Sequence, residues 1–194
     1  HCVWMTRFLY RGRNAYPLLD EWIEKKAEKY WESEEFLKGL PWETEQMSPA
    51  AVDMYKQFGL FPIGDTIRSV SPWWYHVDLE TKKRWFGPTG GFDSEIGWSI
   101  YLKHREKRLR KMQDLYKDSS APLTREFPPV MSGEQHIPLI DSIANDREAI
   151  LQLNIPNRGV ISGIPDDVVV EIPTVVSGRG VQGVHIGELP KRLM

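Results

Sequence analysis

The sequence predicts an α+β fold in which helices pack with an antiparallel sheet. Before residue 117, apolar residues recur every three to four positions in one segment, which is the period of an amphipathic helix, and capping residues predict two further helices. From residue 149 onward, short runs rich in Val and Ile alternate with Gly and Pro turns, as strands do. No internal repeat is visible, so we expect one helix-rich domain with the sheet near its end.

The first elements are a strand and a helix. A strand is expected over residues 1–10, and a helix over residues 15–32. Asn14 is placed to cap this helix, and Pro17 is tolerated in its first turn. One face of the helix collects its apolar residues, which are Leu19, Ile23, Ala27 and Tyr30.

A second, shorter helix and a long loop follow. Ser48 and Pro49 predict the start of the helix, and Gly59 ends it after residue 58. Residues 59–91 carry Gly, Pro and aromatic residues without a clear period, so we expect an ordered loop with short turns. Loops of this length inside a compact domain are often functional.

A long helix is expected next, capped by Asp93 or Ser94 and running to residue 116. Residues 103–111 in its later half are strongly basic. One interpretation is a nucleic-acid surface, and the other is an exposed helix that another domain or subunit partly covers. We favour the second, because the patch is one helix without interleaved aromatic residues and the whole chain is acidic.

The last third of the chain contains the expected sheet. Residues 117–133 are rich in Ser, Pro and charge and predict a linker, and a short helix follows over residues 136–145. The expected strands are residues 149–155, 160–162, 168–172 and 183–188.

The composition limits the class of protein. With 41% hydrophobic and 27% charged residues, the chain has enough apolar side chains for a core and is not expected to be disordered. A net charge of -2 argues against a nucleic-acid partner, and no apolar run of about 18 residues predicts a membrane span. The single cysteine, Cys2, excludes an internal disulfide framework, so a cytoplasmic protein is expected.

Five segments together carry a resemblance to a known family. They are His-Cys-Val-Trp at 1–4, Phe-Pro-Ile-Gly-Asp-Thr-Ile-Arg at 61–68, Gly-Gly-Phe-Asp-Ser-Glu-Ile-Gly-Trp at 90–98, Ser-Gly-Glu-Gln-His-Ile-Pro at 132–138, and residues 154–173. From His1 to Pro190 the sequence resembles the NAD- and metal-dependent glycosidases of glycoside hydrolase family 4. The similarity is greater to the α-glucosidase and α-galacturonidase branch than to the branch that acts on phosphorylated disaccharides.

The resemblance implies a two-domain enzyme. An amino-terminal Rossmann domain would bind NAD through its Gly-rich turn. Residues 1–194 would be the carboxy-terminal substrate and metal domain, similar to that of lactate and malate dehydrogenases. The Rossmann domain would be missing from this chain and would be its partner, so the chain alone is expected to be inactive. A homo-oligomer is also expected.

The resemblance also implies a reaction route. Most glycosidases use two carboxylates, and the NAD-dependent family is an exception. The sugar would be oxidised at C3 with NAD as hydride acceptor, and a base would then remove the C2 proton. The leaving group would depart from C1, water would add, and the hydride would return. The expected substrate is a small carbohydrate, either an unphosphorylated α-glucoside or an α-galacturonide.

Three residues match positions that matter in this family. The resemblance makes His1 a metal ligand, for Mn²⁺ or another divalent first-row metal, although it is also an end residue of this chain. It makes Asp65 the catalytic base, where the alternative is a turn Asp that bonds its own backbone. Arg68, three residues on, would face the same way and bind the sugar, or would only neutralise Asp65.

Two further substrate contacts are expected. The Asn157 amide offers a donor and an acceptor to a sugar or nicotinamide, with turn formation before Gly159 as the alternative. Asn154 favours the turn role. His136 would reach the sugar or cap its own helix.

Two rival functions stay open. One is an oxidoreductase on the same scaffold, such as a hydroxy-acid dehydrogenase, which would oxidise without elimination and need no metal-ligand His. The other is a non-catalytic fragment that only oligomerises.

Overall fold

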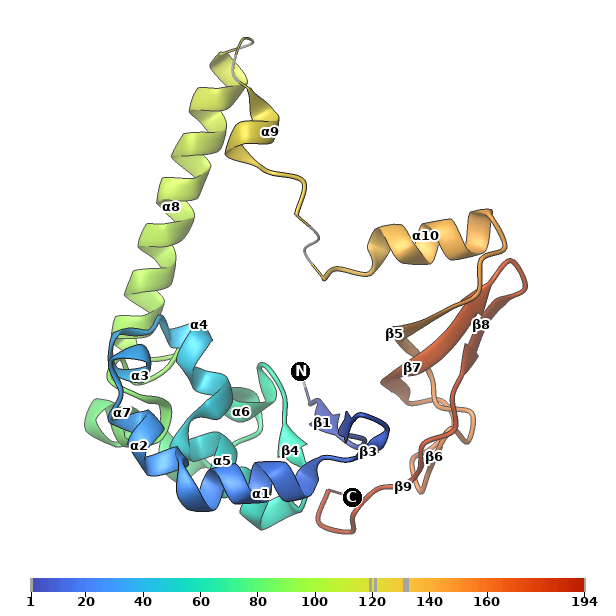
Figure 1. Ribbon diagram of the computed structural model, residues 1–194, viewed down its shortest axis with the longest axis horizontal. Helices are drawn as coiled ribbons and strands as arrows, with labels where there is room; N and C mark the ends of the chain where they lie inside the picture. The colour runs from blue at the N-terminus through green and yellow to red at the C-terminus, as the bar shows by residue number, and fades with distance from the viewer. Residues whose placement is uncertain (1, 119, 121, 131–132, 194) are drawn as a thin grey trace. The chain divides into compact units, whose positions relative to one another are not determined.

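The protein has an α+β fold, as the sequence predicts, and its chain forms two compact units where the sequence analysis expects one domain. The computed structural model describes residues 2–118, 120, 122–130 and 133–193 (Figure 1). The first unit is residues 1–119 and the second is residues 120–194. In the second unit, α9 (Leu123–Glu126) and α10 (His136–Ala144) precede the strands.

The first unit is mostly helical. It contains short strands and turns at β1 (Trp4–Met5), β2 (Leu9–Tyr10), β3 (Arg13–Asn14), β4 (Phe61–Pro62), η1 (Glu45–Met47) and η2 (Trp73–Tyr75). Its helices are α1 (Tyr16–Lys25), α2 (Ala27–Trp31), α3 (Glu34–Lys38), α4 (Pro41–Thr44), α5 (Pro49–Phe58), α6 (Thr66–Ser69), α7 (Leu79–Phe86) and α8 (Glu95–Lys117). Figure 1 shows α8 extending away from the other helices of this unit.

Helix α5 lies at the centre of the first core. Ser48 caps it by accepting a hydrogen bond from the Ala51 N–H, and Gly59 ends it with a φ of 81°, both as the sequence predicts. The core cluster contains Leu19, Ala50, Ala51, Met54, Phe61, Ile67, Tyr75 and Phe86.

The start of the chain is tied to the segment that follows β4. β1 pairs with β4 in an antiparallel register that sets Trp4 opposite Pro62. The Thr66 hydroxyl accepts a hydrogen bond from the Val3 N–H at 2.6 Å and donates one to the Val3 carbonyl at 2.9 Å. The beginning of the chain and the segment 61–68 are therefore neighbours in space.

The second unit is built on a three-stranded antiparallel sheet in the order β5-β7-β8, as expected near the end of the chain. The strands are β5 (Ala149–Pro156), β7 (Val169–Ser177) and β8 (Gly180–Gly183), and α10 packs against β5 and β7. A small parallel pair joins β6 (Ile161–Ser162) to β9 (Gly187–Glu188). Val170, Ile172 and Ile161 form the buried centre of this unit.

Several boundaries differ from the sequence prediction. The expected strand over residues 1–10 is two short strands, because the chain turns into the β2–β3 hairpin. The expected helix over residues 15–32 breaks at Lys26, whose φ is -132°. Asn14 accepts a hydrogen bond from the Tyr16 N–H, although Ala15 holds the cap position. The expected loop over 59–91 contains α7, which Asp78 caps through the Thr81 N–H.

The first turn of α8 packs closely on the preceding loop, and Gly97 makes this possible. A Cβ at Gly97 would lie 2.0 Å from the Gly91 carbonyl oxygen, which is a backbone atom. Ser94 caps the helix by accepting a hydrogen bond from the Gly97 N–H at 2.8 Å. The loop that holds Asp93 is therefore fixed against the start of α8.

Gly97→Ala is expected to lower the free energy of unfolding of the first unit by about 1–3 kcal/mol, because the clash exceeds the gain in helix propensity. Urea unfolding followed by tryptophan fluorescence measures this, since all eight Trp residues lie in the first unit. The control is Ser99→Ala on the exposed side of the same helix, which should change the free energy by less than about 0.5 kcal/mol. Equal stability of both variants would show that the close packing at Gly97 is unimportant.

Candidate functional site

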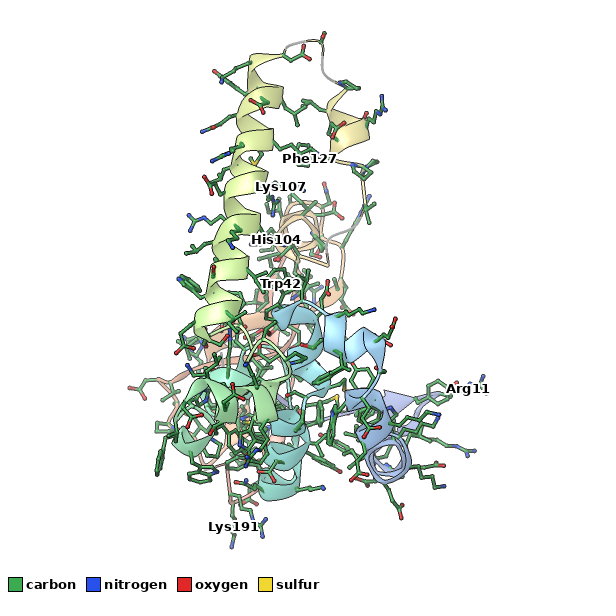
Figure 2. The ribbon with its side chains drawn as sticks, turned by 90° about the vertical axis from the view of Figure 1, so that its left-hand side faces the viewer. Arg11, Trp42, His104, Lys107, Phe127 and Lys191 are labelled. Carbon is green, nitrogen blue, oxygen red and sulfur yellow. The ribbon has the colours of Figure 1, made fainter. Side chains whose placement is uncertain are left out.

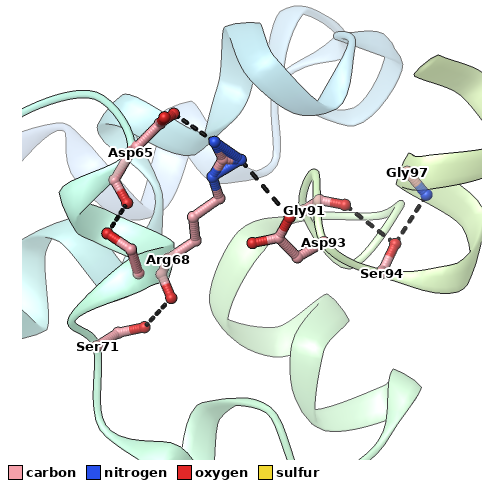
Figure 3. Close-up of polar contacts among 8 residues, drawn as sticks. Asp65, Arg68, Ser71, Gly91, Asp93, Ser94 and Gly97 are labelled. Atoms are coloured by element: carbon pink, nitrogen blue, oxygen red, sulfur yellow. Dashed lines mark hydrogen bonds and ion pairs between the residues drawn. The ribbon is translucent and has the colours of Figure 1, made fainter. Parts of the chain in front are cut away.

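The candidate site is centred on the pair Asp65 and Arg68, at the start of α6. Gly64 has a φ of 56°, which suits glycine, and it turns the chain so that α6 begins at Thr66. Asp65 and Arg68 are three residues apart, about one helical turn, and the Arg68 Nη2 lies 2.5 Å from the Asp65 Oδ1 (Figure 3). The structure thus confirms that these two side chains face each other, as their spacing predicts.

Arg68 is held from two further directions. Its Nη1 lies 3.7 Å from the Asp93 Oδ1, and its guanidinium carbon lies 4.4 Å from the centroid of the Phe92 ring. The ring face attracts the cation. Only 14% of the Arg68 side chain is exposed, so the guanidinium has a fixed position between the α6 segment and the loop before α8.

Glu45 is a member of the site that the sequence analysis missed. It is 7% exposed, and its Oε1 has no hydrogen-bond partner among the described residues. Burial raises the pKa of Glu45 to about 7, against the lowering effect of Arg68 and of a hydrogen bond from the Phe92 backbone. No local signal marks it, because a Glu within the short acidic segment 43–45 resembles a surface residue until tertiary packing buries it.

These groups line one hollow, which we name the acidic pocket. Its volume is ≈ 280 Å³, close to the lower end of ligand pockets, about 300 Å³. The lining residues are Trp42, Glu45, Gln46, Gly64, Asp65, Arg68 and Phe92.

Gln46 fixes the wall of the acidic pocket that carries Asp65. Its Nε2 donates a hydrogen bond to the Pro62 carbonyl at 2.8 Å, and its Oε1 accepts one from the Gly64 N–H at 2.7 Å. Both bonds hold the segment just before Asp65. The orientation of that carboxylate is therefore set by neighbours on either side.

Two other predicted site residues, His136 and Asn157, do not line this pocket. His136 begins α10 in the second unit, and its side chain is 80% exposed, with Nδ1 3.7 Å from the Glu134 Oε2. Asn157 belongs to the same unit and is fully buried. Its amide nitrogen donates to the carbonyls of Ile161 and Ile164, and its oxygen accepts from the Ile161 N–H. This geometry is that of a residue that holds its own turn, and Asn157 offers a substrate no exposed atom.

The described residues do not provide a metal site. Among them, no group of three or more His, Cys, Asp or Glu side chains is arranged to hold a metal ion. His1 lies outside the described residues, so its metal-binding role stays a prediction. In the part of the chain that the structure describes, no helix is long and apolar enough to cross a lipid bilayer.

Comparison with known proteins identifies the family. The profile of the family 4 glycosyl hydrolase C-terminal domain matches residues 1–194. The chain belongs to this family. An α-galacturonidase from Lachnoclostridium phytofermentans is 26% identical over 204 residues, which cover 100% of this chain and 40% of that protein. The family membership predicted from the sequence is thus confirmed, and the chain spans about two fifths of the length of the relatives it matches.

Two solved structures have a similar fold. One is lplD of Bacillus subtilis, a glucosidase candidate, with a TM-score of 0.69, 23% identity, and coverage of 98% of this chain and 41% of that chain. The other is a 6-phospho-α-glucosidase from gut microorganisms, solved in complex with NAD and glucose-6-phosphate. It has a TM-score of 0.57 and 21% identity, and it covers 98% of this chain and 39% of that chain.

The raised pKa of Glu45 predicts a pH dependence of stability. Between about pH 4.5 and 7 the folded protein keeps a proton on Glu45 that the unfolded chain loses. The contribution of this proton to the free energy of unfolding is fully present below about pH 4.5. It is lost as the pH rises through about 7. Glu45→Gln cannot lose a proton, so its stability relative to the wild type should rise by on the order of 3 kcal/mol between pH 4.5 and 8.

Urea unfolding at several pH values measures this difference. The matched control is Glu24→Gln, because Glu24 is exposed on α1. Its stability should follow the wild-type pH curve. If the curves of Glu45→Gln and the wild type were parallel, the pKa of Glu45 would be the same in the folded and the unfolded protein.

Proposed function

We propose that this chain is the sugar-binding half of a glycosidase that hydrolyses α-glycosidic bonds. The observation that carries this proposal is the acidic pocket, in which Arg68 orients the Asp65 carboxylate in a chain of glycosyl hydrolase family 4. Carboxyl, amide and guanidinium groups in its wall suit the hydroxyls of one sugar ring. The aromatic rings of Trp42 and Phe92 supply an apolar surface for the ring itself.

Asp65 is the proposed catalytic base that takes the proton from C2 of the sugar. Its side chain is 39% exposed and lines the pocket, so a bound ligand can reach it. A base must lie within hydrogen-bond distance of the proton it removes, and the rigid neighbours of Asp65 fix this geometry before the substrate binds.

Arg68 and Glu45 are the proposed contacts to the sugar hydroxyls. A guanidinium has five N–H donors, more than the contacts of Arg68 with Asp65 and Asp93 require. Burial raises the pKa of Glu45 to about 7, so this carboxyl group can carry a proton near neutral pH. Its Oε1, which no described residue bonds, can then accept or donate a hydrogen bond to a hydroxyl.

The proposed cofactors of the whole enzyme are NAD and a divalent first-row metal such as Mn²⁺. NAD would accept and return the hydride, and its presence beside glucose-6-phosphate in the 6-phospho-α-glucosidase supports this choice. The proposed partner is an amino-terminal Rossmann domain that would bind it. His1 would be the contribution of this chain to the metal, with other ligands from beyond the described residues.

The substrate that we propose is a small α-glucoside or α-galacturonide, and the α-galacturonidase relative supports the second choice. Contact of His136 with this sugar, assembly into a homo-oligomer and a cytoplasmic location stay predictions.

Asp65→Ala in the enzyme that joins this chain to its NAD-binding domain is expected to lower kcat at least about 100-fold, the effect of losing a general base. Affinity for NAD should be nearly unchanged, because Asp65 contacts the sugar. The assay is release of p-nitrophenol from p-nitrophenyl α-glycosides with NAD and Mn²⁺, and NAD binding is titrated separately. The control is Asp114→Ala on the exposed face of α8, which should keep wild-type turnover.

Two results would contradict the proposal. Turnover of Asp65→Ala within about tenfold of wild type, or roughly 1.4 kcal/mol, would show that Asp65 is not the base. Steady accumulation of NADH without release of p-nitrophenol would instead identify an oxidoreductase.

A further inference from the structure

A second and larger hollow lies beside the acidic pocket, and we name it the arginine pocket. Its volume is ≈ 650 Å³. The residues that line it are Trp42, Phe92, Tyr101, His104, Arg105 and Arg108. Trp42 and Phe92 also line the acidic pocket, so the two hollows share a wall.

One face of α8 supplies four of these side chains. Tyr101, His104, Arg105 and Arg108 follow one another at spacings of three, one and three residues, which places them on the same side of a helix. Trp42, on α4, faces them, and its ring centroid is 5.5 Å from that of His104 (Figure 2). The Phe92 and Tyr101 ring centroids are 5.0 Å apart, which closes the aromatic side of the pocket.

The charge of this pocket is positive and unbalanced. Its lining contains no Asp or Glu, and among the described residues neither Arg105 nor Arg108 forms an ion pair. Arg110 on the same helix differs, because its Nη2 lies 2.5 Å from the Glu106 Oε1. Two unpaired guanidinium groups next to aromatic rings provide bidentate donors for an oxyanion and flat surfaces for a ring.

The acidic pocket has the opposite character. Among the described residues, Arg68 is its only cationic lining residue, and Asp65 and Asp93 already pair with it. Of the two pockets, the arginine pocket is therefore the one whose charge attracts a carboxylate or phosphate of a ligand.

We propose that the arginine pocket is a binding subsite for an anionic sugar residue, whose carboxylate or phosphate contacts Arg105 and Arg108 and whose ring packs on Trp42 and Tyr101. This subsite would hold the leaving-group side of the substrate, so the proposal rests on the function proposed for the acidic pocket. The substrate class is then an α-glycoside whose reacting ring occupies the acidic pocket and whose leaving group carries an anionic unit beyond the shared wall.

The test is a set of titrations of this chain, followed by calorimetry or by tryptophan fluorescence, since Trp42 lies in the wall. The probes are galacturonate, glucose-6-phosphate, glucose and inorganic phosphate, at low and high salt. The double variant is Arg105→Gln with Arg108→Gln, and the matched control is Lys103→Gln with Arg110→Gln. Each double variant removes two positive charges from exposed positions of α8, so the two variants have the same net charge and should fold equally well.

In the wild type, at least one of the two anionic sugars should bind at least tenfold more tightly than glucose, and salt should weaken its binding. The stronger of the two identifies a carboxylate or a phosphate as the natural anion. The double variant should lose at least tenfold in affinity for that sugar, while the control stays within about twofold.

Three results would overturn the proposal. The first is equal binding of glucose and both anionic sugars, the second is equal loss in the two double variants, and the third is binding of inorganic phosphate as tight as that of the sugars. These titrations need neither NAD nor turnover. Their failure leaves the role of Asp65 intact, and failure of the Asp65→Ala prediction leaves the anion measurement intact.

Discussion

The organisation of the site depends on a single cation surrounded by three carboxyl groups. Arg68 pairs with Asp65 and Asp93, and its charge also lowers the pKa of the buried Glu45. Water screens Asp65 and Asp93, which are partly exposed, but Glu45 has little contact with water. Burial therefore makes an ionised Glu45 costly and raises its pKa to about 7, and a proton on Glu45 lowers the negative charge around Arg68.

This cation also connects parts of the chain that are distant in sequence. The Asp65 segment is fixed by Gln46 on one side and, through Thr66, by Val3 on the other. The Asp93 loop is fixed by the close packing at Gly97. Arg68 joins these two segments to each other through Asp65 and Asp93. A fixed separation is what a site needs if a base is to reach a particular proton without rearrangement.

The sequence predicts the elements that have strong local signals. The ends of α5 follow from Ser48 and Gly59, and the start of α8 follows from Ser94, because caps act within one turn. The contact of Asp65 with Arg68 follows from helix geometry in the same way. Helix α7 was missed because its segment is mainly polar, so it gives little apolar periodicity, although Asp78 caps it.

The rest of the site depends on tertiary packing, which leaves no local pattern. Glu45 and its neighbour Glu43 are both carboxylates in a polar segment, yet one is buried and the other exposed. The basic run on α8 was interpreted as a covered or solvated face. The pairing of Arg110 with Glu106 follows from their spacing of four residues, but the sequence contains no sign that Arg105 and Arg108 line a hollow. The hollow forms where the helix passes the aromatic rings of Trp42 and Phe92.

The contrast between the two pockets shows why residue type alone does not define a binding site. Arg68 and Arg105 carry the same charge, but Arg68 is already neutralised by its neighbours and Arg105 is not. The Coulomb energy of a ligand anion depends on the sum of nearby charges and their distances. Near Arg68 that sum is zero or negative, so the guanidinium acts mainly as a hydrogen-bond donor. Near Arg105 the sum is positive, and the same group attracts an anion. The rings of Trp42 and Phe92 separate these two environments, and a ligand long enough to cross them would be oriented by its own charge distribution before any bond is broken.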